Sequence, residues 1–390
     1  YKELKEMKKY EFVENIPIET TLKHPKIRRA QEVWPDMIKH AKKTIDICQF
    51  YISSPKGEDL YPIFGMIIDA ARKGIRVRMI NDAMYHNNYP TNVNFFENIG
   101  NMEVRFLDVT KMMGGGVMHA KYIIIDGTDC FVGSHNFDWK SLKHSQNLGI
   151  RIINKQFADI LTKLFEYDWE LCKTNIRPQS FADEPKYLKK PILIDETDKV
   201  SVLPVVSPAA LTPKGFHTEL EIVMDLIENA KEEILIHIME YSPNSQYSPG
   251  LYLRDYDAAI REAAASKNVK VRLLVSHWAL KKGSLPYVQS LSVLPNIEVR
   301  YMDIPTLGAN FVPFSRVHHV KYMVADYDKS WITSSNLEPD YFLNSRNVGV
   351  GIYGKKPIKT LREVFEINWS SEYARLITAK DNYPTPRIEA

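Results

Sequence analysis

One short pattern of residues occurs twice in this chain, with every internal interval kept and the two copies 200 residues apart. Each copy holds a histidine, a lysine, an aspartate and an asparagine: His119, Lys121, Asp126 and Asn136 in the first, and His319, Lys321, Asp326 and Asn336 in the second. Chance does not preserve spacing in this way, so the repeat predicts two versions of one folding unit. At 390 residues the chain is also too long for one ordinary core, and we expect two domains, residues 1–190 and 191–390.

Apolar, β-rich runs alternate with helical periodicity in both halves. Strands are expected at Thr44–Ile52, Ile75–Asp82, Met102–Val109, Lys121–Asp126, Ile234–Tyr241, Val269–Ser276, Ile297–Ile304 and Lys321–Asp326. Helices are expected at Ile63–Lys73, Phe157–Cys172, Glu219–Lys231, Asp255–Ala265 and Pro357–Ile377. This order predicts the α/β class, with a sandwich around a central mixed β-sheet in each half. The two halves should be related by a pseudo-twofold axis and share one composite active site at their interface.

Three connecting segments have distinct compositions. Thr174–Pro213 contains six prolines and is interpreted as a linker between the halves. The early strands repeat at an offset of about 190 residues, whereas the motifs repeat at 200, so the second half carries an insertion before its motif. We place this insertion at Tyr241–Leu253, as a rim of the site. Gly114–Gly116 is interpreted as a flexible approach to the first motif.

The repeated residues are suited to phosphate chemistry. On an extended segment, the histidine and the lysine of each motif lie two residues apart and point to the same side. An adjacent strand can bring Asn136 and Asn336 beside them, and Ser134, Ser334 and Ser335 are candidate donors to phosphate oxygens. One histidine can attack phosphorus while the other protonates the leaving group, and the lysines and asparagines hold the non-bridging oxygens. A lysine ammonium has no lone pair for a metal, so no metal and no cofactor are expected.

Other candidate residues have a structural alternative. Asp126 and Asp326 each close a strand before a turn, where aspartate commonly accepts backbone N–H groups, and we expect a structural role for both. His318 should face away from its neighbour His319 and act as a bystander. Four aromatic residues near predicted strand ends can stack a base, with core packing as the alternative: Phe50, Tyr51, Tyr241 and Trp278.

The motifs carry a resemblance to a known family. An HxKxxxxD pattern followed by a GSxN-like segment, twice in one chain, resembles the phospholipase D superfamily. Gly133-Ser134-His135-Asn136 fits that pattern, and the second copy has Thr333 where glycine is usual. Longer stretches are similar to the animal lysosomal phospholipase-D-like 5′-exonucleases and their microbial and viral relatives: Gly116–His119, Gly133–Leu142, Val271–Trp278 and His319–Val324.

This resemblance implies a 5′→3′ exonuclease that acts on single-stranded DNA or RNA through a covalent phosphohistidine and releases 3′-phosphorylated nucleotides. By analogy His119 is the nucleophile and His319 the general acid, although pseudo-symmetry leaves the reverse order open. A phospholipase D or phosphatidyltransferase acting on phospholipids is the alternative enzyme. A binding or scaffold protein with a degenerate site is a third reading, which the two intact His-Lys-Asn sets disfavour.

The chain also departs from the family. An acidic residue often found after the motif, thought to orient the histidine, is replaced by Asn147 and Asn347, so we expect another group to control the histidine tautomer. The resemblance favours a secretory, lysosomal or periplasmic location, but only three cysteines leave the cytoplasm open. A net charge of +3 excludes a protein that coats duplex DNA by counterion release. No apolar run reaches the roughly 20 residues of a membrane span, and a homodimer is compatible with the resemblance.

Overall fold

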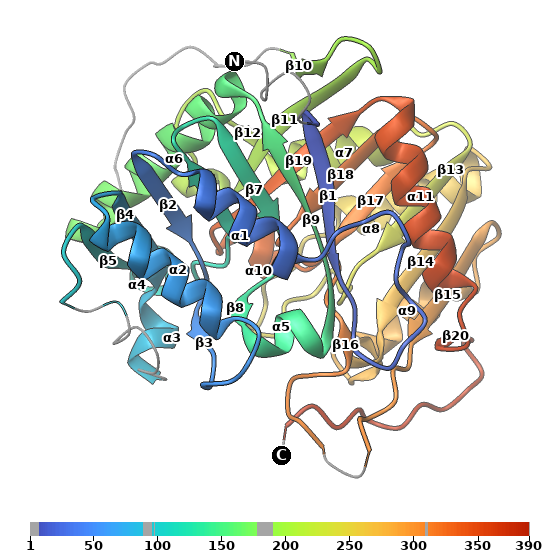
Figure 1. Cartoon of the computed structure of the whole chain (residues 1–390). Coiled ribbons are helices and arrows are strands. Elements are labelled where there is room, and N and C mark those ends of the chain that lie inside the picture. The colour runs from blue at the N-terminus through green and yellow to red at the C-terminus, as the bar shows by residue number, and fades with distance from the viewer. Residues whose placement is uncertain (1–7, 89–95, 97, 178–189, 309–310, 390) are drawn as a thin grey trace.

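The computed structural model describes residues 8–88, 96, 98–177, 190–308 and 311–389. Two large β-sheets lie side by side, each with helices on its faces (Figure 1). The last described helix of the first half ends at Thr174, and the first strand of the second sheet begins at Ile192. Residues between 178 and 189 lie outside the described part, so the expected boundary at residue 190 falls at its edge. The α/β class with a mixed sheet in each half is confirmed.

The first sheet combines a parallel and an antiparallel part. Its strand order is β1 (Tyr10–Asn15), β9 (Ser145–Ile153), β7 (Asp129–Gly133), β6 (Tyr122–Ile125), β2 (Thr44–Cys48), β4 (Arg76–Asp82) and β5 (Met102–Leu107). β2, β4 and β5 are parallel, and the remaining pairs are antiparallel. A short strand of the second half, β16 (Val317–His318), pairs with β9, so the two halves share backbone hydrogen bonding.

The second sheet repeats this arrangement. Its order is β10 (Ile192–Asp195), β11 (Val200–Ser207), β19 (Asn347–Tyr353), β18 (Lys329–Thr333), β17 (Tyr322–Ala325), β13 (Glu233–His237), β14 (Lys270–Ser276), β15 (Ile297–Met302) and β20 (Ala374–Leu376). β13, β14 and β15 are parallel, as β2, β4 and β5 are in the first sheet. The repeat inferred from the motifs therefore extends to the whole sheet, since both halves contain the same arrangement of parallel and antiparallel strands.

Helices cover both faces of the sheets. The longer helices are α1 (Ala30–His40), α2 (Tyr61–Arg72), α6 (Lys155–Thr174), α7 (Glu219–Glu228), α8 (Asp255–Ser266), α9 (Leu285–Ser292) and α11 (Lys355–Trp369). Shorter elements are α3 (Ala83–Asn88), α4 (Val109–Met113), α5 (Trp139–Lys143), α10 (Pro339–Leu343), the 3-10 helices η3 (Ala209–Leu211) and η4 (His277–Leu280), and strands β3 (Ile52–Ser53), β8 (Phe137–Asp138) and β12 (His217–Thr218). No helix among the described residues has the length and apolar character needed to cross a bilayer.

Two hydrophobic cores follow from this layering. One lies between α1, α2 and one face of the first sheet, and it includes Trp34, Phe64 and Ile123. The other lies on the opposite face, where α6 packs, and continues without a break into the second half. α6 suits this position because Asn154 caps its first turn and its apolar residues repeat at helical spacing. The continuous core fixes the two halves against each other.

Some sequence predictions were wrong in extent. The helix expected over Pro357–Ile377 ends at Trp369, and the chain then turns into β20. The proline-rich segment is a linker only in its first part, because β10 and β11 of the second sheet occupy its second part. Strands β9 and β19 were not foreseen. Both bring the residues after the motif back to the interface between the halves.

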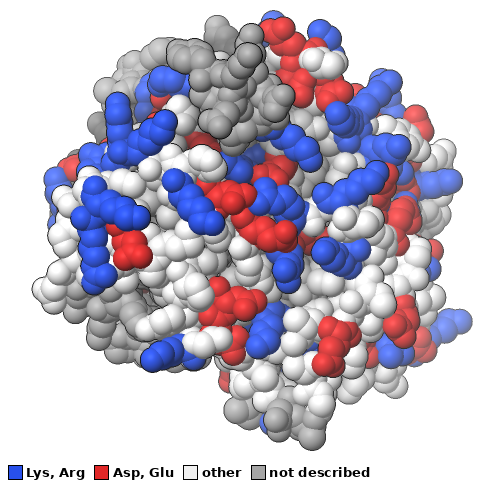
Figure 2. Space-filling view, in the orientation of Figure 1, with Lys and Arg blue, Asp and Glu red and all other residues white. Residues whose placement is uncertain are grey.

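The surface charges are mixed, as the near-balance of 51 basic and 48 acidic residues predicts. Figure 2 shows lysines, arginines, aspartates and glutamates interspersed over the face that carries α1, α2 and α11. This face therefore has no extended field of a single sign.

Candidate active site

Each HxK segment is held by the opposite half of the molecule. The backbone N–H of His119 donates to the carbonyl of Arg346 at 2.8 Å, and that of His319 donates to the carbonyl of Gln146 at 2.7 Å. The expected strands begin one residue later than predicted, since β6 starts at Tyr122 and β17 at the equivalent residue 322. The histidines thus lie on extended segments at the interface, where the two copies meet.

The asparagines after the motifs orient the histidines, and they do so across the interface. His119 Nδ1 lies 3.0 Å from Oδ1 of Asn347, and His319 Nδ1 lies 2.9 Å from Oδ1 of Asn147. The amide of Asn347 donates to the carbonyl of Tyr341 at 3.1 Å, so its oxygen must face the ring. An amide oxygen only accepts, which puts the proton on Nδ1 and leaves Nε2 as the free nucleophile or base. The prediction that another group controls the tautomer was wrong.

The candidate serines support these asparagines instead of facing open space. Ser134 Oγ donates to Oδ1 of Asn147, and Ser334 Oγ donates to Oδ1 of Asn347, both at 2.9 Å. Ser335 Oγ bonds to a buried carboxylate, Glu219. All three hydroxyls lie in the interior, which contradicts their predicted role as phosphate donors.

The two lysines are wholly buried and bond to the carbonyls of their own histidines. The Nζ–O distances are 2.5 Å from Lys121 to His119 and 2.9 Å from Lys321 to His319. The pKa of Lys121 lies well below its usual range because burial disfavours the ammonium and Lys321 adds repulsion. The pKa of Lys321 is likewise lowered by burial. A nearby anion would raise both pKa values.

The electrostatics show that the two motifs act on each other. Burial lowers the pKa of His119 well below its usual range, and Lys121 and Lys321 lower it further. Burial also lowers the pKa of His319, with further contributions from Lys321, Lys121 and His119. Both imidazoles are therefore neutral without a ligand. Four predicted residues from two halves form one composite cluster.

The motif asparagines and an aromatic wall complete this cluster. Asn136 and Asn336 are buried, and the Oδ1 atom of each has no hydrogen-bond partner among the described residues. Phe50 packs against His119 with 5.1 Å between ring centroids, and Lys121 Nζ lies 5.4 Å from the centre of the Phe50 ring. Tyr51 belongs to the same wall and donates its hydroxyl to Asp138 at 2.6 Å.

Two further aromatic residues of the site were not predicted. Tyr85 stacks on Tyr51 at 4.4 Å and 18°, and also lies 5.0 Å from Phe50. Tyr341 places its ring 5.2 Å from His119, edge to face. Tyr85 follows the end of β4, where loops of a parallel sheet gather, and that position was the available signal.

The two predicted stacking residues of the second half have different surroundings. Tyr241 is wholly buried, and its hydroxyl donates to Asp257 at 2.6 Å, so its ring has no free face for a base. Trp278 is half-buried and lies 6.2 Å from Phe314. His318 is buried behind the site and contacts the carbonyl of Ile238 at 2.8 Å through Nε2.

The segments at the rim are tightly packed. Ser245 and Ser248 in the predicted insertion both bond to Asp340 at the start of α10. Gly116 has φ of +78°, and a Cβ there would lie 2.4 Å from the carbonyl oxygen of Asn344. The glycine segment is therefore a close contact between the halves and not a flexible approach.

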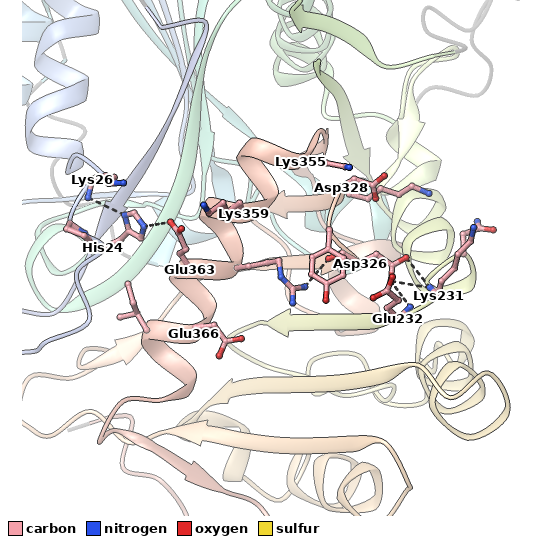
Figure 3. Close-up of a pocket in the computed structure, with 16 residues that line it drawn as sticks. His24, Lys26, Lys231, Glu232, Asp326, Asp328, Lys355, Lys359, Glu363 and Glu366 are labelled. Carbon is pink, nitrogen blue, oxygen red and sulfur yellow. Dashed lines mark hydrogen bonds and ion pairs between the residues drawn. The ribbon is translucent and has the colours of Figure 1, made fainter. Parts of the chain in front are cut away.

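The motif aspartates lie at the opposite ends of β6 and β17 from the histidines. Asp126 accepts the backbone N–H groups of residues 42–44, each at 2.8 Å, and Asp326 accepts those of residues 231–233 (Figure 3). A groove of about 1220 Å³ opens beside Asp326, between the loop at His24 and α11. It is remote from the histidines and carries no part of the proposed chemistry. Among the described residues, no group of three or more His, Cys, Asp or Glu side chains is arranged to hold a metal.

Comparison with known proteins identifies the family. The model described as "Cardiolipin synthase, PLD-like domain" matches residues 35–169 and 223–369, once in each half. The chain belongs to the phospholipase D-like family. It is 27% identical to phospholipase D Z of Dictyostelium discoideum over 94% of this chain and 90% of that protein.

Other members of the family bear the names of different activities. A 5′-3′ exonuclease of Xenopus laevis is 29% identical over 87% of this chain and 75% of its own length. The virion nicking-joining enzyme of vaccinia virus, strain Western Reserve, is 29% identical over 91% of this chain and 86% of its own length. The phosphatidylserine synthase structure of Haemophilus influenzae has a TM-score of 0.64 at 15% identity, covering 89% of this chain and 85% of that one. The last comparison supports the fold.

Proposed function

We propose that this protein is a metal-independent phosphodiesterase that acts as a 5′→3′ exonuclease on single-stranded DNA or RNA. The observation that carries the proposal is the crossed arrangement at the interface, where each histidine is oriented by an asparagine of the other half. Two buried lysines beside them supply positive charge for the phosphate. The intact cluster argues against a degenerate binding protein.

The proposed mechanism has two in-line steps. In the first, Nε2 of His119 attacks phosphorus and the P–O bond to the leaving 5′ oxygen breaks, while His319 donates a proton to that oxygen. In the second, His319 removes a proton from water, the water oxygen bonds to phosphorus, and the P–N bond to His119 breaks. The released nucleotide retains the 3′-phosphate. A bound phosphodiester raises the pKa of His319 and so lets it serve as the acid in the first step.

The substrate class rests on the aromatic wall. Phe50 and the stacked pair Tyr51 and Tyr85 lie beside His119, and aromatic rings next to a phosphate site can stack a base. Exonuclease relatives at similar identity add support. Phospholipase or phosphatidyltransferase activity is the second candidate, because a relative of comparable similarity bears the name phospholipase D.

Digestion of 5′-hydroxyl and 5′-blocked single-stranded oligonucleotides in EDTA tests the proposal, with His119→Ala and His319→Ala as controls. We expect 3′-phosphorylated mononucleotides to be released stepwise from the free 5′ end and both variants to be inactive. Internal cuts would indicate an endonuclease instead. If no strand is cleaved and phospholipid is hydrolysed or transferred, the second candidate replaces the first.

A further inference from the structure

The second half has an unusual set of side chains beside its catalytic asparagine. Tyr241 and Leu337 form a parallel bridge, and both side chains are wholly buried in the core. Because side chains alternate along an extended chain, the residues that flank this bridge share the opposite face. These residues are Glu240, Ser242, Asn336 and Glu338. Two glutamates thus lie on the same face as the asparagine.

Glu338 presents a buried polar atom that has no partner. Its side chain is fully buried, and Oε1 accepts a hydrogen bond of 2.5 Å from Nε2 of Gln246. Its Oε2 atom and the Oδ1 atom of Asn336 have no hydrogen-bond partner among the described residues, whereas the side-chain amide of Asn336 interacts with Tyr341. Buried polar groups are usually paired in folded proteins, so a ligand group or water is expected to complete this face.

The two glutamates are not equivalent. Glu240 forms an ion pair with Lys281, which compensates its charge. Burial raises the pKa of Glu338 well above its usual range, and Glu240 raises it further. This environment favours the protonated form of Glu338. Since Gln246 donates to Oε1, the proton belongs on Oε2, which makes this atom a hydrogen-bond donor.

Other donors lie near that atom. Lys321 is buried, and only one hydrogen bond from its Nζ is made within the described residues, to the carbonyl of His319. The carboxylates of Glu338 and Glu240 both raise the pKa of Lys321, against the effect of burial. Tyr341, whose ring contacts His119, is also within reach of the Glu338 charge. The face is thus continuous with the catalytic cluster.

We propose that protonated Glu338 is a further phosphate-binding residue, which donates from Oε2 to a non-bridging oxygen held by Lys321 and Asn336. The inference rests on the phosphodiester chemistry proposed above and adds a donor to it. At the corresponding bridge of the first half, between Ile52 and Phe137, the flanking residues Tyr51 and Asp138 are bonded to each other. The donor set around the phosphate is therefore asymmetric although the motifs are symmetric.

Ionisation of Glu338 would replace this donor with a negative charge that repels the phosphate. Titratable and charged groups face Glu338 from several elements: Glu240 after β13, Tyr247 before α8, Tyr256 on α8, Lys281 after η4, Lys321 before β17, and Asp340 and Tyr341 on α10. Anion binding should therefore weaken as pH rises, in part through Glu338.

Sulfate is the probe of choice, because it remains a dianion from about pH 5 to 9. Its affinity would be measured by calorimetry for the wild type, Glu338→Gln and Glu338→Ala across this range. Asp257→Asn is the matched control, since Asp257 is also a buried carboxylate of the second half but bonds to Tyr241 and Arg261. Thermal unfolding establishes that each variant is folded.

We expect Glu338→Gln, whose amide donates and cannot ionise, to match the wild type at acidic pH and bind more tightly at alkaline pH. Glu338→Ala should bind about tenfold to hundredfold more weakly at acidic pH, as expected for a lost donor to a charged group. The control should follow the wild type. The inference is overturned if Glu338→Ala binds normally, or if Glu338→Gln weakens at alkaline pH more than the wild type.

The digestion assay separates this inference from the proposed function. If sulfate binding depends on Glu338 as described but no nucleic acid is cleaved, only the function is wrong. If strands are digested and Glu338→Ala binds sulfate normally, only the inference is wrong.

Discussion

Replacing Asn347 with alanine tests the crossed arrangement most directly. Oδ1 of Asn347 accepts from His119 Nδ1 at 3.0 Å and from Ser334 Oγ at 2.9 Å, while its amide donates to Tyr341. Alanine removes all three contacts and leaves buried polar groups unpaired. A buried hydrogen bond lost at the imidazole costs about 1–3 kcal/mol. At about 1.4 kcal/mol per factor of ten, the expected loss in kcat/KM is roughly 5-fold to 150-fold.

Asn347→Asp provides the informative comparison. It keeps an acceptor for Nδ1 but adds a negative charge, which raises the pKa of His119. A nucleophilic histidine must be neutral, so the acidic limb of the kcat/KM profile should move to higher pH. Oligonucleotide digestion as a function of pH measures both variants. Wild-type activity in Asn347→Ala with an unchanged pH profile would refute the argument that this asparagine orients the nucleophile.

Three other changes have expected outcomes. Arg346→Met leaves the buried carboxylate of Asp168 unpaired, so we expect the free energy of unfolding, measured with denaturant, to fall by about 3–5 kcal/mol. The same change in an Asp168→Asn background should lower it clearly less. Gly116→Ala forces a Cβ to 2.4 Å from the carbonyl oxygen of Asn344, so we expect a lower melting temperature and reduced activity; a wild-type melting temperature would contradict this contact. Burial raises the pKa of Glu219 to about 7, above its unfolded value. The free energy of unfolding should therefore fall by on the order of 3 kcal/mol as pH rises from about 4.5 to 7. Glu219→Gln should make the free energy of unfolding less dependent on pH in this range, as measured by denaturant unfolding at several pH values.

Much of the architecture could be predicted from local sequence patterns. The parallel strands β2, β4 and β5, their counterparts in the second half and helix α6 all begin and end close to the predicted residues. The overextended helix after Pro357 was less predictable, because its apolar periodicity continues past Trp369 while the chain turns to join the edge of the sheet. The local pattern of apolar residues does not indicate where the chain can leave a helix and add a strand to the edge of a sheet.

The residues of the candidate site were likewise predictable only in part. Residue type and spacing single out the histidines, lysines and asparagines, because phosphate transfer needs those groups and a repeat preserves their intervals. Sequence reasoning assigned Ser134, Ser334 and Ser335 to the phosphate, but all three are buried and bond within the protein. A hydroxyl near a motif has the same appearance in sequence whether it faces a ligand or a neighbouring side chain.

By itself, the sequence determined that the chain holds two copies of one unit, and it predicted that they share one composite site, since neither copy alone supplies both histidines. Only the tertiary structure decided how they meet. Asn147 and Asn347 each orient the histidine of the other half, and Glu338 places a buried carboxyl oxygen without a hydrogen-bond partner among the described residues beside the second motif. These contacts join residues about 170 to 230 positions apart, and they depend on packing across the interface that no local pattern of residues encodes.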